Sequence, residues 1–353
     1  MRARSGIASL LLSLPLLSAA GWAQLAPSPD APPVSTAPAQ PEDDQSVATF
    51  KLQVSLVDLF FTVKDKTGQL VPHLSKADCA VTEDKQPQTW KTFTAENDLP
   101  LTLGILLDTS GSQQYVLPLE QQAGSQFLQQ VLRKKDEAFL ISFDVNVDLL
   151  QDFTNSPRLL ARAMDKAQIN TAGGNGGSGI PGLGGGTIPT VGDPKGTLLY
   201  DAIDMAANDK LTQETGRKAM IVLTDGEDEG SRVRIQEAIA AAQRSNAIVY
   251  VILIADTGFY GGLNLGYSGY SAAHKIAEET GGRVINVGNN GKKLADAFQQ
   301  IEDELRTQYV GTYTPTNTRM DGTFRHISVN CGQGMHVQVK HGYFAPTASE
   351  QER

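Results

Sequence analysis

The sequence predicts an α/β fold in which a doubly wound, mostly parallel sheet is inserted in a small β-sandwich formed by the flanking N- and C-terminal segments. Two observations support this prediction. Strand-like and helix-like patterns alternate through residues 101–306, and period-two patterns lie on both sides, at 49–63 and 309–344. Alternating β and α elements build a parallel sheet covered by helices on both faces, whereas period-two patterns are typical of strands with one buried face.

The elements of the α/β region follow from their apolar spacing. Residues 101–108 and 247–255 are apolar over nearly their whole length, as in strands that are buried on both faces of a sheet. The expected strands are 101–108, 138–143, 145–153, 218–225, 247–255 and 284–287. The expected helices are 113–133, 159–167, 197–207, 233–244, 272–280 and 293–306. Gly281-Gly282 is a signal for the end of a helix.

The flanking segments show no helical period. Apolar residues stand at every second position from Phe50 to Leu56, and a turn is expected at 83–85. Asp321-Gly322 predicts a hairpin turn. The expected strands of the flanks are 49–63, 80–82, 88–93, 309–313, 323–330 and 336–344. We infer that the two flanks pair into one β domain.

The first residues are expected to be a targeting segment. Arg2 and Arg4 give a positive start, residues 7–17 form a short apolar run, and small residues follow. A membrane anchor that is never cut is the alternative, but the run is shorter than the roughly 20 residues that a spanning helix needs. We therefore expect a signal peptide at 1–23 and a Pro- and Ala-rich disordered linker at 24–47.

Charge and composition limit the partners and the location. The formal net charge is −9, and no basic cluster of the nucleic-acid-binding type is present. Nucleic acid is therefore not expected as a partner. No second apolar stretch is long enough to cross a membrane, so no transmembrane segment is expected in the mature chain. The protein is expected to be exported, and to be periplasmic or extracellular.

The chain has two cysteines, Cys79 and Cys331, one on each flank. An even count in an exported chain permits a disulfide, because exported proteins meet an oxidising environment. Such a bond would close the β domain. Two buried free thiols are the alternative.

Three short motifs stand at the ends of expected strands, where open parallel sheets bind ligands. They are Asp108-Thr109-Ser110-Gly111-Ser112, Gly196-Thr197 and Thr224-Asp225-Gly226. Hydroxyl and carboxylate oxygens are hard ligands that suit Mg²⁺, Mn²⁺ or Ca²⁺, and no Cys/His cluster favours zinc. Ser110 and Ser112 occupy alternate positions, so both oxygens can face one ion. The structural alternatives are helix capping by Asp108, Ser110 and Thr197, and a plain turn at Asp225.

These motifs, in this order and at these strand ends, resemble the metal-ion-dependent adhesion site of the von Willebrand factor A family. The resemblance covers about residues 99–307 and implies a Rossmann-like sheet. It implies that the three hydroxyl residues bind the ion directly and that the two aspartates act mainly through bound water. An open position on the ion can then take a carboxylate from a partner protein. The implied metal-binding residues are Asp108, Ser110, Ser112, Thr197 and Asp225.

The flanks resemble the von Willebrand factor A-related proteins common in Acidobacteria, in the segments ELRTQYVGTYTP, DGTFRHISV and HGYFAP. Those proteins share an exported β–α/β–β layout with no assigned activity. An aromatic residue usually occupies the place of Cys79 in that pattern. The cysteine at this position is therefore consistent with a specific role, namely pairing with Cys331.

The expected layout combines these parts. In chain order it comprises a signal peptide at 1–23, a linker at 24–47, an N-terminal β segment at 48–98, a von Willebrand factor A domain at 99–307, a C-terminal β segment at 308–346 and a tail at 347–353.

Three further polar features are interpreted without a ligand. The glycine-dense stretch 173–186 predicts a flexible surface insertion, because no strand leads into it as a dinucleotide motif requires. The acidic run 227–229 is favoured as a solvated loop, with a second cation site as the alternative. Asp201 is expected near a helix start, where a carboxylate favours the helix dipole.

We expect a protein that is not an enzyme. The sequence has no H-E-x-x-H, no P-loop and no nucleophile elbow in a strand-turn-helix context. The expected function is protein binding or cell adhesion that depends on a divalent cation, Mg²⁺ or else Mn²⁺ or Ca²⁺. The alternatives are a metal-free structural component of a cell-envelope assembly and an unrecognised hydrolase.

Overall fold

The computed structural model describes residues 56–95, 99–170, 196–254 and 268–347. The predicted signal peptide, the predicted linker and the glycine-dense stretch 173–186 lie outside the described residues. Within the described ranges, no helix is both long enough and apolar enough to span a bilayer.

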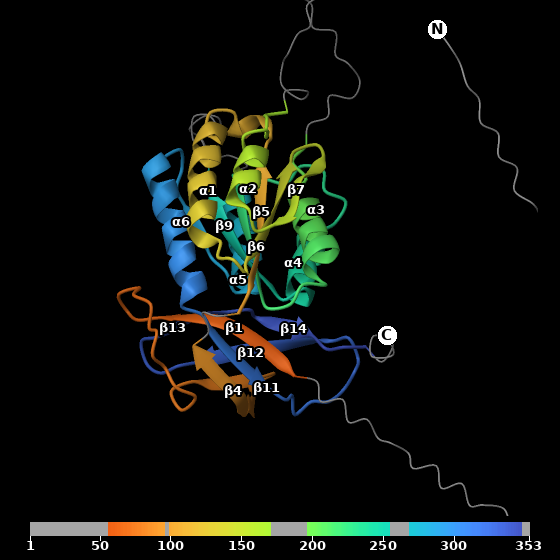
Figure 1. Cartoon of the computed structure of the whole chain (residues 1–353). Coiled ribbons are helices and arrows are strands. Elements are labelled where there is room, and N and C mark those ends of the chain that lie inside the picture. Colours follow the sequence, from red (N-terminus) through yellow and green to blue (C-terminus); the bar gives the residue numbers. More distant parts are fainter. Residues whose placement is uncertain (1–55, 96–98, 171–195, 255–267, 348–353) are drawn as a thin grey trace, which may run out of the picture. The chain divides into compact units, whose positions relative to one another are not determined.

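A six-stranded sheet forms the centre of the α/β domain (Figure 1). Five strands are parallel, and β7 pairs antiparallel with β6 at one edge, in the order β10-β9-β8-β5-β6-β7. Every residue of β5 is buried, because this strand has neighbours on both sides and helices on both faces. The strands are β5 (Leu101–Asp108), β6 (Glu137–Phe143), β7 (Val147–Thr154), β8 (Arg217–Thr224), β9 (Ala247–Leu253) and β10 (Val284–Asn286).

Helices cover both faces of this sheet (Figure 1). One hydrophobic cluster joins the sheet to α1 (Leu117–Val131), α2 (Pro157–Met164) and α6 (Gly291–Arg306). The other cluster joins the opposite face to α3 (Leu199–Met205), the π-helical turn Ala206–Leu211, α4 (Ile235–Arg244) and α5 (Gly269–Thr280). The predicted fold class, a doubly wound and mostly parallel sheet, is therefore confirmed.

Two local features of the helices match the sequence pattern. Gly281 ends α5 in a left-handed conformation with φ of 88°, as the Gly-Gly signal predicts. A side chain at Gly281 would also place its Cβ 2.5 Å from the backbone nitrogen of Lys340.

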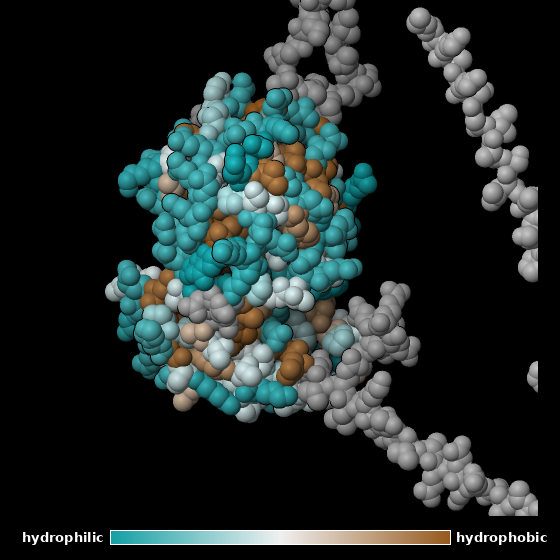
Figure 2. Space-filling view, viewed as in Figure 1, coloured by the Kyte–Doolittle hydropathy of each residue, from teal (hydrophilic) through white to brown (hydrophobic). Residues whose placement is uncertain are grey.

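On the face shown in Figure 2, hydrophilic residues dominate the α/β domain and hydrophobic residues form small groups between them. The apolar sides of the helices therefore face the sheet.

The two flanks form two four-stranded antiparallel sheets. In the first, β1 lies between β13 and β11, and β4 pairs with the other side of β11. In the second, β12 lies between β14 and β2, and β3 pairs with β2. Strands from the two ends of the sequence thus lie side by side, as inferred for one β domain. Their bounds are β1 (Val57–Lys64), β2 (Ala80–Glu83), β3 (Gln86–Gln88), β4 (Trp90–Ala95), β11 (Tyr309–Tyr313), β12 (Phe324–Asn330), β13 (His336–Val339) and β14 (Gly342–Phe344).

The predicted hairpin at Asp321-Gly322 is wrong. The strands before and after it, β11 and β12, belong to different sheets and do not pair with each other. The expected strand at 336–344 is likewise divided between β13 and β14, which also lie in different sheets. Alternating residues predict that a segment is extended, but the pairing partner is decided by contacts between residues far apart in sequence.

The buried core of the β-sandwich is aromatic. Phe61 of β1 stacks on Tyr309 of β11 and on Trp90 of β4, with ring centroids 5.5 Å and 6.0 Å away. Tyr309 is fully buried, and its hydroxyl donates a hydrogen bond to the carbonyl of Val71 at 2.6 Å and accepts one from the amide of Leu74 at 2.9 Å. The aromatic ring therefore packs in the core while its hydroxyl anchors a loop.

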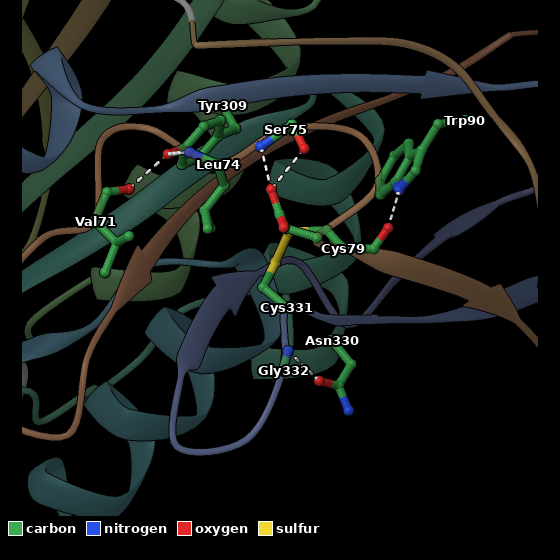
Figure 3. Close-up of a disulfide and its surroundings, with 10 residues drawn as sticks. Val71, Leu74, Ser75, Cys79, Trp90, Tyr309, Asn330, Cys331 and Gly332 are labelled. Carbon is green, nitrogen blue, oxygen red and sulfur yellow. Dashed lines mark hydrogen bonds between the residues drawn. A yellow bond between two sulfur atoms is a disulfide. The ribbon is translucent and has the colours of Figure 1, made fainter.

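A disulfide joins Cys79 to Cys331 across 252 positions of the sequence (Figure 3). It continues the ladder between β2 and β12, whose last pair is Ala80 and Asn330. The indole nitrogen of Trp90 donates a hydrogen bond to the carbonyl of Cys79 at 2.8 Å, which fixes the strand end beside the bond (Figure 3). The cysteines are thus bonded, and the alternative of two free thiols is not observed.

Glu304, near the end of α6, bonds the α/β domain to the β-sandwich. Its side chain is 2% exposed and accepts hydrogen bonds from Lys64 at 2.7 Å and from Arg283 at 2.6 Å. Gln338 of β13 donates a further one at 3.3 Å. Two cations compensate the buried charge, as a buried carboxylate requires.

Removal of the disulfide is expected to destabilise the protein. A C79A/C331A variant should lose about 2–5 kcal/mol of unfolding free energy, because the bond restricts a long loop of the unfolded chain. Urea denaturation of the wild type and the variant measures the difference. The control is a thiol assay on denatured, non-reduced wild type, and two reactive thiols there would contradict the bond.

Candidate metal centre

The candidate site lies where the strand order of the sheet reverses. From β5 the chain continues to β6 and β7 on one side, and then returns to β8 on the other side of β5. Ligands of open α/β sheets bind at such a switch point, at the carboxyl ends of the strands. Asp108 is the last residue of β5, and Asp225 directly follows β8.

Asp108 is held in a fixed orientation inside the protein. Its side chain is fully buried. The hydroxyl of Thr224 donates a hydrogen bond to one carboxylate oxygen at 2.6 Å, and the amide of Ser110 donates to the other at 2.9 Å. The ends of β5 and β8 are therefore joined through this carboxylate.

The side chains of Ser110 and Ser112 lie together as predicted. Their hydroxyl oxygens are 3.0 Å apart. Ser110 is 8% exposed and precedes the short 3-10 helix Gly111–Gln113, but its side chain does not cap that helix. The Ser110 hydroxyl is therefore paired with that of Ser112 and not with a helix amide.

Thr197 is connected to the same edge through its backbone. It exchanges hydrogen bonds with Glu229, at 3.0 Å and 2.9 Å. The residue that flanks α3 is Leu198, and the Thr197 hydroxyl makes no hydrogen bond with another of the described residues. Helix capping by Thr197, the structural alternative, is therefore not observed.

Asp225 is 2% exposed, and one of its carboxylate oxygens accepts a hydrogen bond from the amide of Glu227 at 3.1 Å. The next residue, Gly226, has φ of +85°. A Cβ there would lie 2.4 Å from the carbonyl oxygen of Gly269, so a side chain is excluded. The glycine thus permits the close approach between the end of β8 and the start of α5.

Asp144, which directly follows β6, organises the loops around the site. Its carboxylate accepts hydrogen bonds from the Thr109 hydroxyl at 2.8 Å and from the Asn170 side chain at 3.0 Å. Its carbonyl accepts one from the amide of Leu198 at 2.8 Å. Sequence reasoning missed this residue, although an aspartate directly after a buried strand is the signal that identified Asp108.

The acidic run 227–229 has structural partners. The carboxylate of Glu227 accepts hydrogen bonds from the amides of Ser268 and Gly269 at the start of α5, at 2.5 Å and 2.9 Å. The carboxylate of Asp228 accepts one from the amide of Tyr200 at 3.0 Å. These side chains hold loops and helix starts in place, which explains the acidic run without a second cation.

Burial of acidic groups dominates the electrostatics of the site. Burial raises the pKa of Asp108 from 3.8 to about 7, and the negative charge of Asp225 adds to this effect. Burial also raises the pKa of Glu120, on α1, well above its ordinary value, and the charges of Asp108 and Asp225 contribute. No Lys or Arg in the described ranges forms an ion pair with Asp108.

The residues present fit a hard divalent cation. Paired hydroxyl oxygens stand beside a buried carboxylate that forms no ion pair with a described Lys or Arg, and such oxygens are the ligands of Mg²⁺ and Ca²⁺. In the described part of the chain, no three His, Cys, Asp or Glu side chains gather closely enough to hold a metal by themselves. An ion at this site therefore needs the hydroxyl groups.

Residues 190–300 match the family model of the von Willebrand factor type A domain. The chain contains a von Willebrand factor type A domain. The matched segment includes Thr197 and Asp225, whereas Asp108, Ser110 and Ser112 precede it. The family expected from the motifs is therefore confirmed, and the site geometry connects the first motif to the matched segment.

Solved structures similar to this chain have low sequence identity. The conserved hypothetical protein BatB from Bacteroides thetaiotaomicron is 19% identical over 58% of this chain and 98% of that chain, with a TM-score of 0.42. The vWF domain of the type V pili tip protein Mfa5 from Porphyromonas gingivalis is 13% identical over 58% and 94%, with a TM-score of 0.41. Proximal thread matrix protein 1 from the mussel byssus, with a zinc-occupied MIDAS motif, is 13% identical over 62% and 48%, with a TM-score of 0.43. No curated protein matches the chain.

The metal-free protein is expected to lose stability as the pH rises to neutrality. Since folding raises the pKa of Asp108 from 3.8 to about 7, the folded state retains a proton that the unfolded state releases. This stabilisation is complete below about pH 4 and is lost as the pH rises to about 7. Urea denaturation in the presence of a chelator, at pH values from about 4 to about 7, measures this change in the free energy of unfolding.

The matched variant for this experiment is D108N, which has no titratable group at that position. Its unfolding free energy should fall less with pH than that of the wild type. Glu120 contributes in the same direction in both proteins, because its pKa is also raised. Identical pH profiles of the two proteins would show that Asp108 does not hold the proton.

Proposed function

We propose that this von Willebrand factor type A domain binds a divalent cation at the end of β5 and uses it to hold a protein ligand. The observation that supports this proposal best is the pair of hydroxyl oxygens of Ser110 and Ser112, 3.0 Å apart, beside the fully buried carboxylate of Asp108. The family match is a second support, since von Willebrand factor type A domains mediate protein interactions.

Each site residue has a defined task in this proposal. The hydroxyls of Ser110, Ser112 and Thr197 hold the ion directly, and Asp108 and Asp225 act through bound water. Neutral direct ligands leave most of the positive charge of the ion uncompensated at the surface. When bound, Mg²⁺, Mn²⁺ or Ca²⁺ supplies an open position that favours a hard, negatively charged oxygen. A carboxylate on the partner protein is such a ligand.

The protein is proposed to act by binding and not by catalysis. In this function the hydroxyls and carboxylates around the site hold the ion and its water, the loop amides fix the carboxylates, and none serves as a nucleophile or a general base. A metal-free scaffold in a cell-envelope assembly is the second candidate. Its support is that each motif loop is already fixed by hydrogen bonds that involve no ion, such as the one from Thr224 to Asp108.

The proposed location is outside the cytoplasm, in the periplasm or beyond the cell. The disulfide between Cys79 and Cys331 supports it, because such bonds persist in oxidising compartments. The signal peptide predicted at 1–23 provides the route of export. Cell adhesion through the bound cation is compatible with this location.

Calorimetric titration of the purified protein with Mg²⁺ and with Mn²⁺ tests the cation site. The wild type should show saturable binding, and D108A or S110A should show none, because each loses an oxygen that holds the ion or its water. S156A is the matched control. Ser156 follows the antiparallel strand β7, so it lies at the end of the sheet opposite to the carboxyl ends of the parallel strands. Binding that persists in folded D108A and S110A would contradict the assigned site.

Affinity capture from the source organism tests the protein ligand. A partner that binds the wild type, and that is released by chelator or by S110A, supports cation-dependent binding. Capture that is unaffected by chelator favours the metal-free scaffold. Turnover of a substrate that D108A abolishes, with partner binding intact, would instead favour a hydrolase.

A further inference from the structure

Three buried acceptor oxygens near the site have no hydrogen-bond donor among the residues that the structure describes. They are both carboxyl oxygens of Glu120 and the side-chain carbonyl oxygen of Gln113. Glu120 is fully buried, and Gln113 is 1% exposed. A buried polar atom without a partner destabilises the folded protein, commonly by about 1–3 kcal/mol. Three of them on two side chains seven positions apart in the sequence therefore require an explanation.

Gln113 contacts the candidate site, and Glu120 lines a small hollow next to it. The side-chain nitrogen Nε2 of Gln113 donates hydrogen bonds to the hydroxyl of Ser112 at 3.4 Å and to the backbone carbonyl of Ile254 at 3.5 Å. Ile254 and Glu120 line the same small hollow, together with Leu119. Gln113 thus contacts one of the proposed ligands, and Ile254 connects it to the hollow that Glu120 lines from the first turn of α1.

The position of Glu120 is one where an apolar residue is expected. It lies on the buried face of α1, which also presents Leu117, Ala123, Phe127 and Leu128 to the core. The other residues of this face pack in the hydrophobic cluster between α1 and the sheet. In the described ranges, no Lys, Arg or His forms an ion pair with Glu120. Packing therefore does not account for a carboxyl group here.

The charges around Glu120 point to a cation. Burial is the main cause of the raised pKa of Glu120, and the negative charges of Asp108 and Asp225 raise it further, so the three carboxyl groups interact electrostatically. Burying carboxyl groups that repel one another is unfavourable unless a positive charge compensates them. A hydrated divalent cation supplies that charge and also supplies water molecules as hydrogen-bond donors.

We propose that Glu120 is a further residue of the cation site, and that its carboxylate, together with the carbonyl oxygen of Gln113, accepts hydrogen bonds from water molecules held by the ion. This inference rests on the proposed function, because it assumes that a cation binds beside Ser110 and Ser112. Glu120 acts through water and not as a direct ligand. It explains the three orphan oxygens together, and it adds a residue that the strand-end motifs do not contain.

Two substitutions at Glu120 separate this role from a structural one. E120Q keeps the size of the side chain and one acceptor oxygen, and it should weaken Mg²⁺ binding by about tenfold, as removal of an outer-shell partner of a metal site typically does. E120L removes both acceptors and should weaken binding further. In the absence of cation, E120L should raise the unfolding midpoint, because an apolar side chain replaces an unpaired buried carboxyl.

A matched control is the neighbouring residue Gln121. Its side chain donates hydrogen bonds to the carbonyls of Met164 and Ala167, at 2.8 Å and 2.9 Å, and so faces α2 instead of the site. Q121L should lower stability and leave Mg²⁺ affinity unchanged. A loss of affinity in E120Q therefore cannot arise from a general disturbance of α1.

The experiment is Mg²⁺ and Mn²⁺ calorimetry on the four proteins, with thermal unfolding in chelator and circular dichroism to verify folding. Weaker cation binding in E120Q and E120L, with raised metal-free stability in E120L, supports the proposal. Wild-type affinity in both variants overturns it while leaving the proposed function intact. If the wild type itself binds neither ion, the proposed function fails, and the role of Glu120 fails with it.

Discussion

The site depends on the burial of the Asp108 carboxylate at the end of the central strand. β5 has strands on both sides and helices on both faces. Its last residue is therefore buried, even though it stands at the carboxyl end of the strand. The hydroxyl of Thr224, on the adjacent strand β8, fixes the carboxylate at 2.6 Å. The enclosed carboxylate forms no ion pair with a described Lys or Arg, and in the proposed function the bound cation compensates it.

The loops around this carboxylate are held by hydrogen bonds that cross from one strand end to the next. Asp144 after β6 binds the Thr109 loop and the loop before α3, and Glu229 pairs with Thr197. Glu227 ties the loop after β8 to the start of α5. The hydroxyl and carboxylate groups are thus placed by the sheet before any ligand binds. Such preorganisation reduces the conformational entropy that ligand binding must overcome.

The β-sandwich holds together the two points where the chain enters and leaves the α/β domain. β4, the last strand before the α/β domain, pairs with β11, the first strand after it, and Ala95 lies opposite Tyr309. The entry and exit of the inserted domain are therefore side by side. The disulfide between Cys79 and Cys331 joins the same two flanks, and Glu304 bonds α6 to β1 and β13. Because the disulfide persists in the unfolded chain, it lowers the entropy of that chain and so favours the folded state.

The sequence by itself predicted the elements of the α/β domain and proposed the residues of the candidate site. Apolar periodicity predicted the strands and helices of the α/β domain, Gly281 predicted the end of α5, and the motifs located Asp108, Ser110, Ser112, Thr197 and Asp225. These features depend on a few neighbouring residues, so a local pattern is enough to recognise them. The bonding of the two cysteines was left open by the sequence, which permitted a disulfide and also two free thiols.

Only the tertiary structure decided which strands pair and which buried carboxyl groups interact electrostatically. It placed β11 and β12 in different sheets, against the predicted hairpin at Asp321-Gly322. It also brought Glu120, on an apolar face of α1, into the field of Asp108 and Asp225, and gave Asp144 its part in joining the loops. Strand pairing and buried charge both arise from contacts between distant parts of the chain, and a local pattern does not contain them.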